Sequence, residues 1–194
     1  MNYLNLEEIR AVCADHEIPY KILAEYPDRT VKATKDIDRK PIVLARLRRY
    51  LATGKVSPPT CIPARIVRLG APPAKPGPRD RLYYRWYSKE YPSILRALGE
   101  LTEGRFRNGV VARVLAMEFW TRGEAPTLAE FARAWTRAQA DQQRSVNPEY
   151  AYLTDVKYNR AGREWKSLRN AKAASALQTL ERIAPSRDTS EPRG

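Results

Sequence analysis

Two carboxylates and a lysine in the first quarter of the chain are residue types that can support metal-dependent hydrolysis. Pro27-Asp28 is followed, after a gap, by Asp38-Arg39-Lys40. In such a set the carboxylates hold Mg²⁺ and the lysine supports the attacking water. The second carboxylate would have to lie on a strand, whereas Pro41 and the helical apolar spacing after it indicate a helix. Nuclease activity is therefore the least favoured function, and we expect no catalytic residues.

The single histidine is the other candidate for metal or nucleophile chemistry. His16 stands three residues after Cys13, and no other thiol or imidazole lies nearby in the sequence. We interpret His16 as the end of a helix. The chain also has no glycine-rich phosphate loop and no serine-nucleophile motif. We expect no metal, no cofactor and no enzymatic activity.

Basic residues at the start of a predicted helix suit a different chemistry, the binding of phosphate. The candidates for nucleic-acid binding are Arg39, Lys40, Arg46 and Arg49. Arg39, Arg46 and Arg49 fall on one flank of the apolar stripe and Arg48 on the other. The N–H groups and the dipole at a helix start favour an anion. Contacts of this kind position a protein on DNA but carry little sequence information. The alternative is a solvated helix face.

A second candidate surface interleaves aromatic rings with arginine in the segment 83–87. Its members Tyr84, Arg85 and Trp86 are residue types that stack on unpaired bases. The alternative interpretation of this cluster is the lid of a domain core. The aromatic segment is the feature that would favour RNA or single-strand binding over duplex binding.

The charge balance of the chain requires an explanation in terms of its partners. The 194 residues include 35 Lys and Arg against 22 Asp and Glu, a formal net charge of +13. Nucleic acid is the leading partner class, and an anionic membrane surface or an acidic protein comes behind it. Residues 1–70 carry 13 basic and 8 acidic side chains, so the excess is not confined to one tail.

Cysteine content and hydropathy bear on where the protein works. Two cysteines are too few for a disulfide scaffold or a four-ligand zinc site, which favours a reducing compartment. No segment approaches the ~18 apolar residues of a membrane span, and residues 1–8 lack the features of a signal peptide. We expect a bacterial cytoplasmic protein without membrane contact, associated with the nucleoid if it binds DNA.

Helix start and stop signals recur along most of the chain. Helices are predicted from Asn5 to Ile18-Pro19, over 39–53, from Pro92 to Gly104, over 108–122, from Thr127 onwards, and over 148–183 with a break near 159–162. Strand signals are weak and fall at 65–69 and 81–87. The predicted fold class is mainly α: a small helix–extended loop–helix module, a Pro-rich linker and then a four- to five-helix domain.

Proline placement divides the chain into domains. Seven prolines lie between residues 57 and 78, and proline removes a backbone donor and disfavours helix and central strand. The prediction is a helix-turn-helix module at 1–56, a linker at 57–80, a helical domain at 81–184 and a disordered tail at 185–194. Two short helices bury too little surface to be stable alone, so the module is expected to lean on its own insert or on the second domain.

The first module resembles the SAP domain, a small helix–extended turn–helix fold. Ile9-Arg10, Cys13, Ile18-Pro19, Lys40, Val43 and Arg46-Leu47 match the order and local spacing of that family. Glu17 stands where the family has a glycine, no glycine precedes Lys40, and the segment Tyr20–Ile37 is longer than the usual connection. The resemblance implies DNA binding at this connection and at the start of the second helix.

The second domain is similar, more faintly, to a helical domain that follows SAP modules in uncharacterised bacterial proteins. Phe106, Phe119-Trp120, Gly123, Thr127-Leu128 and Trp135 carry this likeness, and it implies no activity. The expected function is that of a non-catalytic DNA-binding protein that contacts the phosphate backbone of duplex DNA with little sequence specificity. A protein-interaction adaptor and an RNA or single-strand binder are the alternatives.

Overall fold

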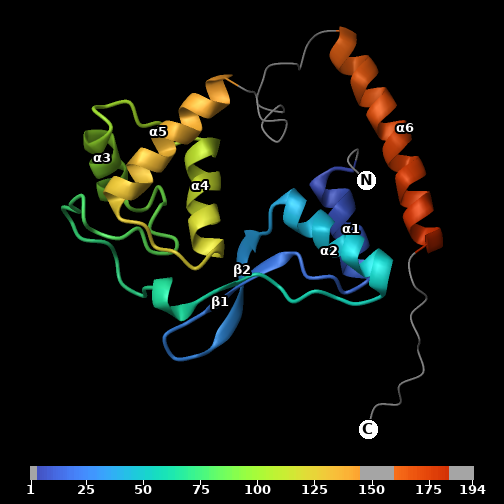
Figure 1. Ribbon diagram of the computed structural model, residues 1–194, viewed down its shortest axis with the longest axis horizontal. Helices are drawn as coiled ribbons and strands as arrows, with labels where there is room; N and C mark the ends of the chain where they lie inside the picture. Colours follow the sequence, from blue (N-terminus) through green and yellow to red (C-terminus); the bar gives the residue numbers. More distant parts are fainter. Residues whose placement is uncertain (1–3, 145–159, 184–194) are drawn as a thin grey trace. The chain divides into compact units, whose positions relative to one another are not determined.

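Helices dominate the computed structural model, which describes residues 4–144 and 160–183 (Figure 1). The helices of these residues are α1 (Leu6–Asp15), α2 (Lys40–Thr53), α3 (Pro92–Leu101), α4 (Val110–Thr121), α5 (Leu128–Arg144) and α6 (Arg160–Ile183). The remaining elements are β1 (Lys21–Glu25), β2 (Val31–Ile37), β3 (Cys61–Ile62) and a 3-10 turn, η1 (Ala64–Ile66). The mainly α class is confirmed.

Local capping interactions set the helix ends at the places that the sequence predicts. At α1, Glu8 N–H donates to Asn5 Oδ1 over 2.8 Å and Asn5 N–H donates to Glu8 Oε2 over 2.7 Å. Thr127 and Glu130 form the same reciprocal pair at the start of α5. Helix α2 ends at Gly54, whose φ of +67° is the left-handed conformation that glycine adopts most readily. Each end depends on residues a few positions apart.

Strands form where the sequence shows little strand signal. The sheet order is β2-β1-β3, and β1 pairs in parallel with β3 through Leu23 opposite Cys61 and Ala24 opposite Ile62. The predicted segment 65–69 overlaps η1 instead. Within the part of the chain that the structure describes, the segment 81–87 contributes one isolated bridge, Arg81 to Thr127. A two-residue strand such as β3 is too short for alternation to reveal it.

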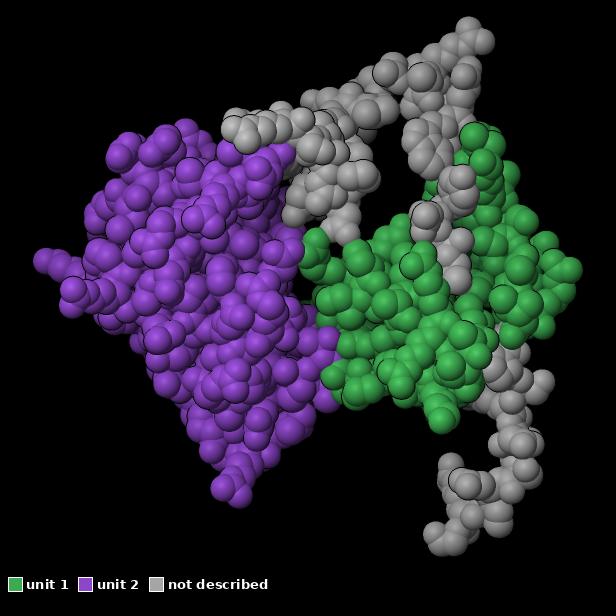
Figure 2. Space-filling view, viewed as in Figure 1, with its two compact units in different colours: residues 1–21, 36–59, 154–194 green, residues 22–35, 60–153 purple. Residues whose placement is uncertain are grey.

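The chain folds into two compact units (Figure 2). Unit 1 comprises Met1–Lys21, Asp36–Pro59 and Thr154–Gly194, and unit 2 comprises Ile22–Lys35 and Thr60–Leu153. The boundary positions show that the chain leaves unit 1 after residue 21, returns at residue 36, and leaves it again after residue 59. Neither unit is therefore one continuous stretch of sequence.

This division differs from the predicted one in three places, each for a reason of packing. The segment 22–35 belongs to unit 2 because Ile22 and Ala24 are buried in the core of that unit. Residues from Thr60 onwards also belong to unit 2, because Ile62, Ile66 and Val67 are buried there rather than exposed on a linker. Helix α6 belongs to unit 1, which leaves three helices in the described part of unit 2.

Helix α6 completes the core of unit 1. Ala173 and Leu180 are buried in one cluster with apolar residues of α1, of α2 and of the segments that flank α1, namely Leu4, Ile9, Cys13, Ile18, Val43, Leu44, Leu47 and Tyr50. Arg169 of α6 also pairs with Glu8 of α1. The two-helix module thus shares its core with a helix more than 100 residues later in the chain.

Aromatic rings fill the core of unit 2, in which α5 packs against both α3 and α4. The ring of Phe106 lies 5.0 Å from that of Trp135, and the ring of Tyr84 meets that of Trp120 edge-on at 5.3 Å. The indole N–H of Trp120 donates to the carbonyl of Leu82 over 3.0 Å. Ile62, Ile66 and Val67 are part of this core, whereas Leu69 is 79% exposed.

Some predictions fall on residues outside the described ranges. These are the helix start at Pro148 and the disordered tail at 185–194, while the predicted break near 159–162 overlaps the start of α6 at Arg160. Of the helices in the described ranges, none is long and apolar enough to span a bilayer.

Replacing Leu180 by alanine tests whether α6 stabilises unit 1. Leu180 is 4% exposed, and the loss of a buried leucine side chain costs about 2–4 kcal/mol of unfolding free energy. Urea unfolding followed by circular dichroism measures the change. The control is Leu168→Ala on the same helix, where the leucine is 55% exposed and a change within about 0.5 kcal/mol is expected. Equal effects of the two substitutions would contradict the packing of α6.

Candidate nucleic-acid interface

The exposed face of α2 is basic, and the side chains around its arginines are small. Helix α2 contains Lys40, Arg46, Arg48 and Arg49 and no acidic residue. Arg48 and Arg49 are both exposed, and the other exposed positions up to residue 52 are Pro41, Ala45 and Ala52. Small side chains around two guanidinium groups let a flat or convex anionic surface approach closely. Arginine presents a planar fork of donors that matches a phosphate group.

The start of α2 adds positive charge to this face. Arg39 is the residue before the first turn, with φ −63° and ψ 148°, and its side chain does not cap the helix. Arg39 and Lys40 are half-buried and each makes a further contact within the protein. The N–H groups of Ile42 and Val43 donate to the carbonyl of Arg39. The predicted residues Arg39 and Lys40 therefore lie at the positive end of the helix dipole.

Arg46 has a structural role, which corrects its prediction as a phosphate contact. Its side chain is 9% exposed, and Nη1 lies 2.6 Å from Oδ2 of Asp38, whose side chain is fully buried. The same Nη1 donates to the carbonyl of Pro19 over 2.9 Å. The apolar face of α2 extends far enough round the helix to include Arg46. A buried guanidinium that is committed to a buried carboxylate cannot reach a ligand.

Arg48 takes the place of Arg46 on the exposed surface. The sequence assigns Arg48 to the opposite flank of the stripe from Arg49, but the burial of Arg46 shifts the exposed face so that Arg48 and Arg49 share it. The sequence signal for this arrangement is Asp38. It is an acidic residue just before α2 and eight positions before Arg46, which lies on the apolar side of that helix.

Most of the aromatic cluster 83–87 packs in or against the core of unit 2. Tyr84 is 4% exposed and packs edge-on against Trp120. Trp86 is half-buried, and its indole N–H donates to the carbonyl of Gly70 over 3.0 Å. Arg85 is exposed and has a φ of +67°. The interpretation of this cluster as the lid of a core holds for Tyr84. Its prediction as a nucleic-acid-binding residue is corrected, because its ring is buried.

The two carboxylates of the nuclease pattern lie in unrelated local environments. Asp28 accepts from the N–H and the hydroxyl of Thr30 in the turn between β1 and β2, and Asp38 is held by Arg46. In the described ranges, no three or more His, Cys, Asp and Glu side chains are grouped where they could hold a metal ion. His16 is the residue at the C-terminal end of α1, as predicted, and its Nδ1 lies 3.4 Å from the hydroxyl of Tyr50.

Removing the cation of the buried pair is expected to destabilise unit 1 strongly. Arg46→Met leaves the carboxylate of Asp38 buried without its cation, which costs about 3–5 kcal/mol of unfolding free energy. In the double variant Asp38→Asn/Arg46→Met no charge remains buried, so the loss is smaller than the sum of the two single losses. Urea unfolding of the four proteins measures the coupling. Arg49→Met, at an exposed position, is the control, and additive single losses would exclude the pair as a stabilising contact.

Burial raises the pKa of the Cys13 thiol to about 11, and the nearby Arg46 cation opposes this by a smaller amount. The unfolded thiol ionises at a lower pH than the folded one, so raising the pH from about 9 to 11 reduces the stability of unit 1. We expect urea unfolding to show a steeper loss over this range in the wild-type protein than in Cys13→Ala. We also expect a thiol reagent to modify the exposed Cys61 in the folded protein and Cys13 only on unfolding. Rapid modification of both thiols would contradict this assignment.

Comparison of the chain with protein-family models, with curated proteins and with solved structures finds no match.

Proposed function

We propose that the protein binds the phosphate backbone of duplex DNA, without catalysis, through the exposed face of α2 in unit 1. The observation that carries this proposal is the charge of α2: four basic residues, no acidic residue, and an exposed face that holds Arg48 and Arg49 beside Ala45 and Ala52. Arg39 and Lys40 extend the positive surface to the start of the helix. Pairing with Asp38 removes Arg46 from this set.

The chemistry of this face favours phosphate over bases as its ligand. Guanidinium groups on a helix face without aromatic side chains contact the DNA backbone and contribute affinity rather than sequence discrimination. The net charge of +13 for the whole chain adds a long-range attraction to any polyanion. The expected binding is therefore strongly dependent on salt and weakly dependent on sequence.

The resemblance of unit 1 to the SAP domain supports the same surface. Ile9, Cys13, Ile18 and Leu47, four of the residues that carry the resemblance, are all buried in one core. Glu17, which stands where the family has a glycine, has a φ of +55°. The turn thus has the left-handed conformation that glycine adopts most readily. Residues 22–35 of the long connection belong to unit 2, so the proposed contacts are those of α2 and its start.

A salt series with a mixed-sequence duplex tests the proposal. One phosphate contact for each of the four basic residues of this surface gives a slope of log K against log salt of about −4, at ~0.9 per phosphate. The variant Arg48→Ala/Arg49→Ala should bind about tenfold more weakly, which corresponds to ~1.4 kcal/mol, and its slope should be shallower by ~1.8. Fluorescence anisotropy of a labelled duplex measures both quantities.

The matched control is Arg96→Ala/Arg137→Ala, which removes the same charge from exposed positions on α3 and α5. It should change the affinity less than the α2 variant does. If the two double variants weaken binding equally, net charge rather than α2 is responsible. A wild-type slope near −1 would refute binding to the backbone, and a preference for unpaired strands would favour the single-strand alternative.

A further inference from the structure

Unit 2 contains a pocket of about 410 Å³ whose two walls are α5 and the loop between α3 and α4. The loop contributes Arg105 and Arg107, and α5 contributes Trp135, Thr136, Gln139 and Ala140. The size is within the range of small-molecule sites, roughly 300–1,000 Å³. None of these residues belongs to α2 or to unit 1, so the pocket is distinct from the proposed DNA-binding face.

The indole of Trp135 is the first indication that this pocket receives a ligand. Trp135 is 3% exposed, and its Nε1 is buried without a hydrogen-bond acceptor; among the described residues, the other such side-chain atom is Nε of Arg10. In contrast, the indole N–H groups of Trp86 and Trp120 each donate to a carbonyl over 3.0 Å. Leaving a buried donor unsatisfied is unfavourable. Trp135 lines the pocket, so a ligand acceptor that reaches this nitrogen would satisfy it.

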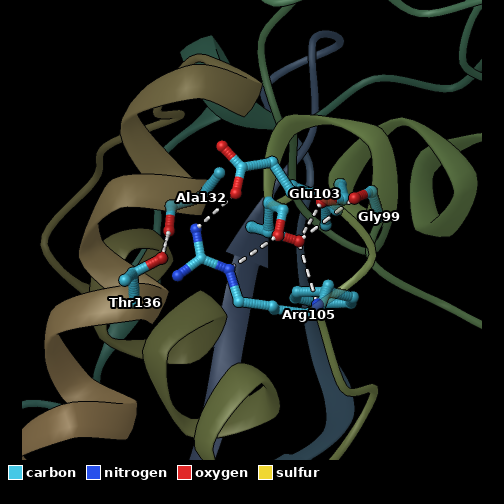
Figure 3. Close-up of polar contacts among 8 residues, drawn as sticks. Gly99, Glu103, Arg105, Ala132 and Thr136 are labelled. Carbon is cyan, nitrogen blue, oxygen red and sulfur yellow. Dashed lines mark hydrogen bonds and ion pairs between the residues drawn. The ribbon is translucent and has the colours of Figure 1, made fainter.

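The second indication is a rigid loop that brings two guanidinium groups to the pocket. The hydroxyl of Thr102 donates to the carbonyl of Leu98 over 2.9 Å and accepts from the N–H of Phe106 over 2.9 Å. Phe106 is 9% exposed and packs on the indole of Trp135. The loop is therefore anchored in the core between its two arginines. Figure 3 shows Arg105 extending from this loop toward the turn of α5 that holds Thr136.

Each arginine keeps part of its donor set available. Nε of Arg105 donates to the carbonyl of Thr102 over 3.1 Å, and its Nη2 contacts Glu103 over 3.2 Å in an exposed pair (Figure 3). Nη1 of Arg107 donates to the carbonyls of Gly104 and Phe106. For Nη1 of Arg105 and for Nε and Nη2 of Arg107, the described residues provide no acceptor. These bonds hold the side chains in place while leaving donors for a ligand.

The donor chemistry defines the ligand class. Arginine and tryptophan side chains carry donors and no acceptors, and two guanidinium groups add positive charge. We propose that this pocket binds a small molecule through an oxyanion group, a phosphate or a carboxylate, which accepts from Trp135 Nε1 and from Arg105 and Arg107. The exposed ion pair between Arg105 and Glu103 is weak, so an oxyanion can compete with it. Gln139 and Thr136 offer further polar contacts to the rest of the molecule.

Thermal unfolding of the full chain with added inorganic phosphate or citrate, at constant ionic strength set with chloride, tests this proposal. We expect a saturable rise of the unfolding midpoint with one of the two anions. The anion that binds more tightly shows whether the ligand group is a phosphate or a carboxylate. Trp135→Phe keeps an aromatic ring, though a smaller one, and removes the donor, and Arg107→Ala removes a guanidinium at an exposed position. Each substitution should raise the dissociation constant of the anion at least tenfold. Arg137→Ala, on α5 outside the pocket, should bind the anion like the wild-type protein.

Two further readings separate this site from a structural role and from DNA binding. Without anion, Trp135→Phe is expected to unfold at a lower midpoint because the smaller ring leaves a void in the core, so anion binding by each variant is measured as the shift from that variant's own anion-free midpoint. If neither anion shifts the wild-type midpoint, or if Arg107→Ala binds the anion like the wild-type protein, the proposal is overturned. Displacement of the anion by duplex DNA would assign the pocket to a nucleic-acid surface and overturn the small-molecule assignment. None of these anion-binding measurements depends on α2. A negative result for the pocket would therefore not count against the proposed DNA binding.

Discussion

The ion pair between Arg46 and Asp38 is the contact on which the organisation of unit 1 depends. One nitrogen of the guanidinium bridges the carboxylate of Asp38 and the carbonyl of Pro19. The N–H of Asp38 in turn donates to the carbonyl of Tyr20 over 2.9 Å. These bonds join the two ends of the segment that leaves unit 1 after residue 21 and returns at residue 36. The helical module can therefore close although its connection belongs to unit 2.

A small core also explains why unit 1 uses a distant helix. Two helices of 10 and 14 residues bury too little apolar surface to offset the conformational entropy that folding removes. The apolar side of α6 adds Ala173 and Leu180 to that core, and the pair between Arg169 and Glu8 adds a polar contact at its edge. Because the apolar side of α2 is used in this core, its opposite side, which is basic, is exposed. Stability and the proposed DNA contact thus use different faces of one helix.

The arginines of this chain differ in their local environment. Arg46, whose side chain is 9% exposed, is paired with the buried carboxylate of Asp38 and has a structural role. Arg48 and Arg49 lie on the exposed face of α2, where we propose contact with a large polyanion, and Arg105 and Arg107 line the pocket of unit 2, where we propose a small anion. A single count of basic residues cannot separate these roles, although each has a distinct chemical consequence.

The sequence alone determined the features that depend on neighbouring residues. Asn5 with Glu8, Gly54, and Thr127 with Glu130 mark helix ends because a cap is made within a few residues of the chain. The mainly α class and the basic character of α2 follow from the same local reading. Of the predicted site, Arg39, Lys40 and Arg49 keep their place on the candidate surface.

Tertiary structure decided what depends on contacts between distant residues. The fate of Arg46 required knowing that Asp38 is buried beside it, and that of Tyr84 required its packing against Trp120. The membership of residues 22–35 depends on pairing with β3, which is too short to show a pattern, and that of α6 on a core formed by α1 and α2. Contacts of this kind cannot be predicted from neighbouring residues, because the local sequence around a side chain or strand does not depend on which distant residue packs against it.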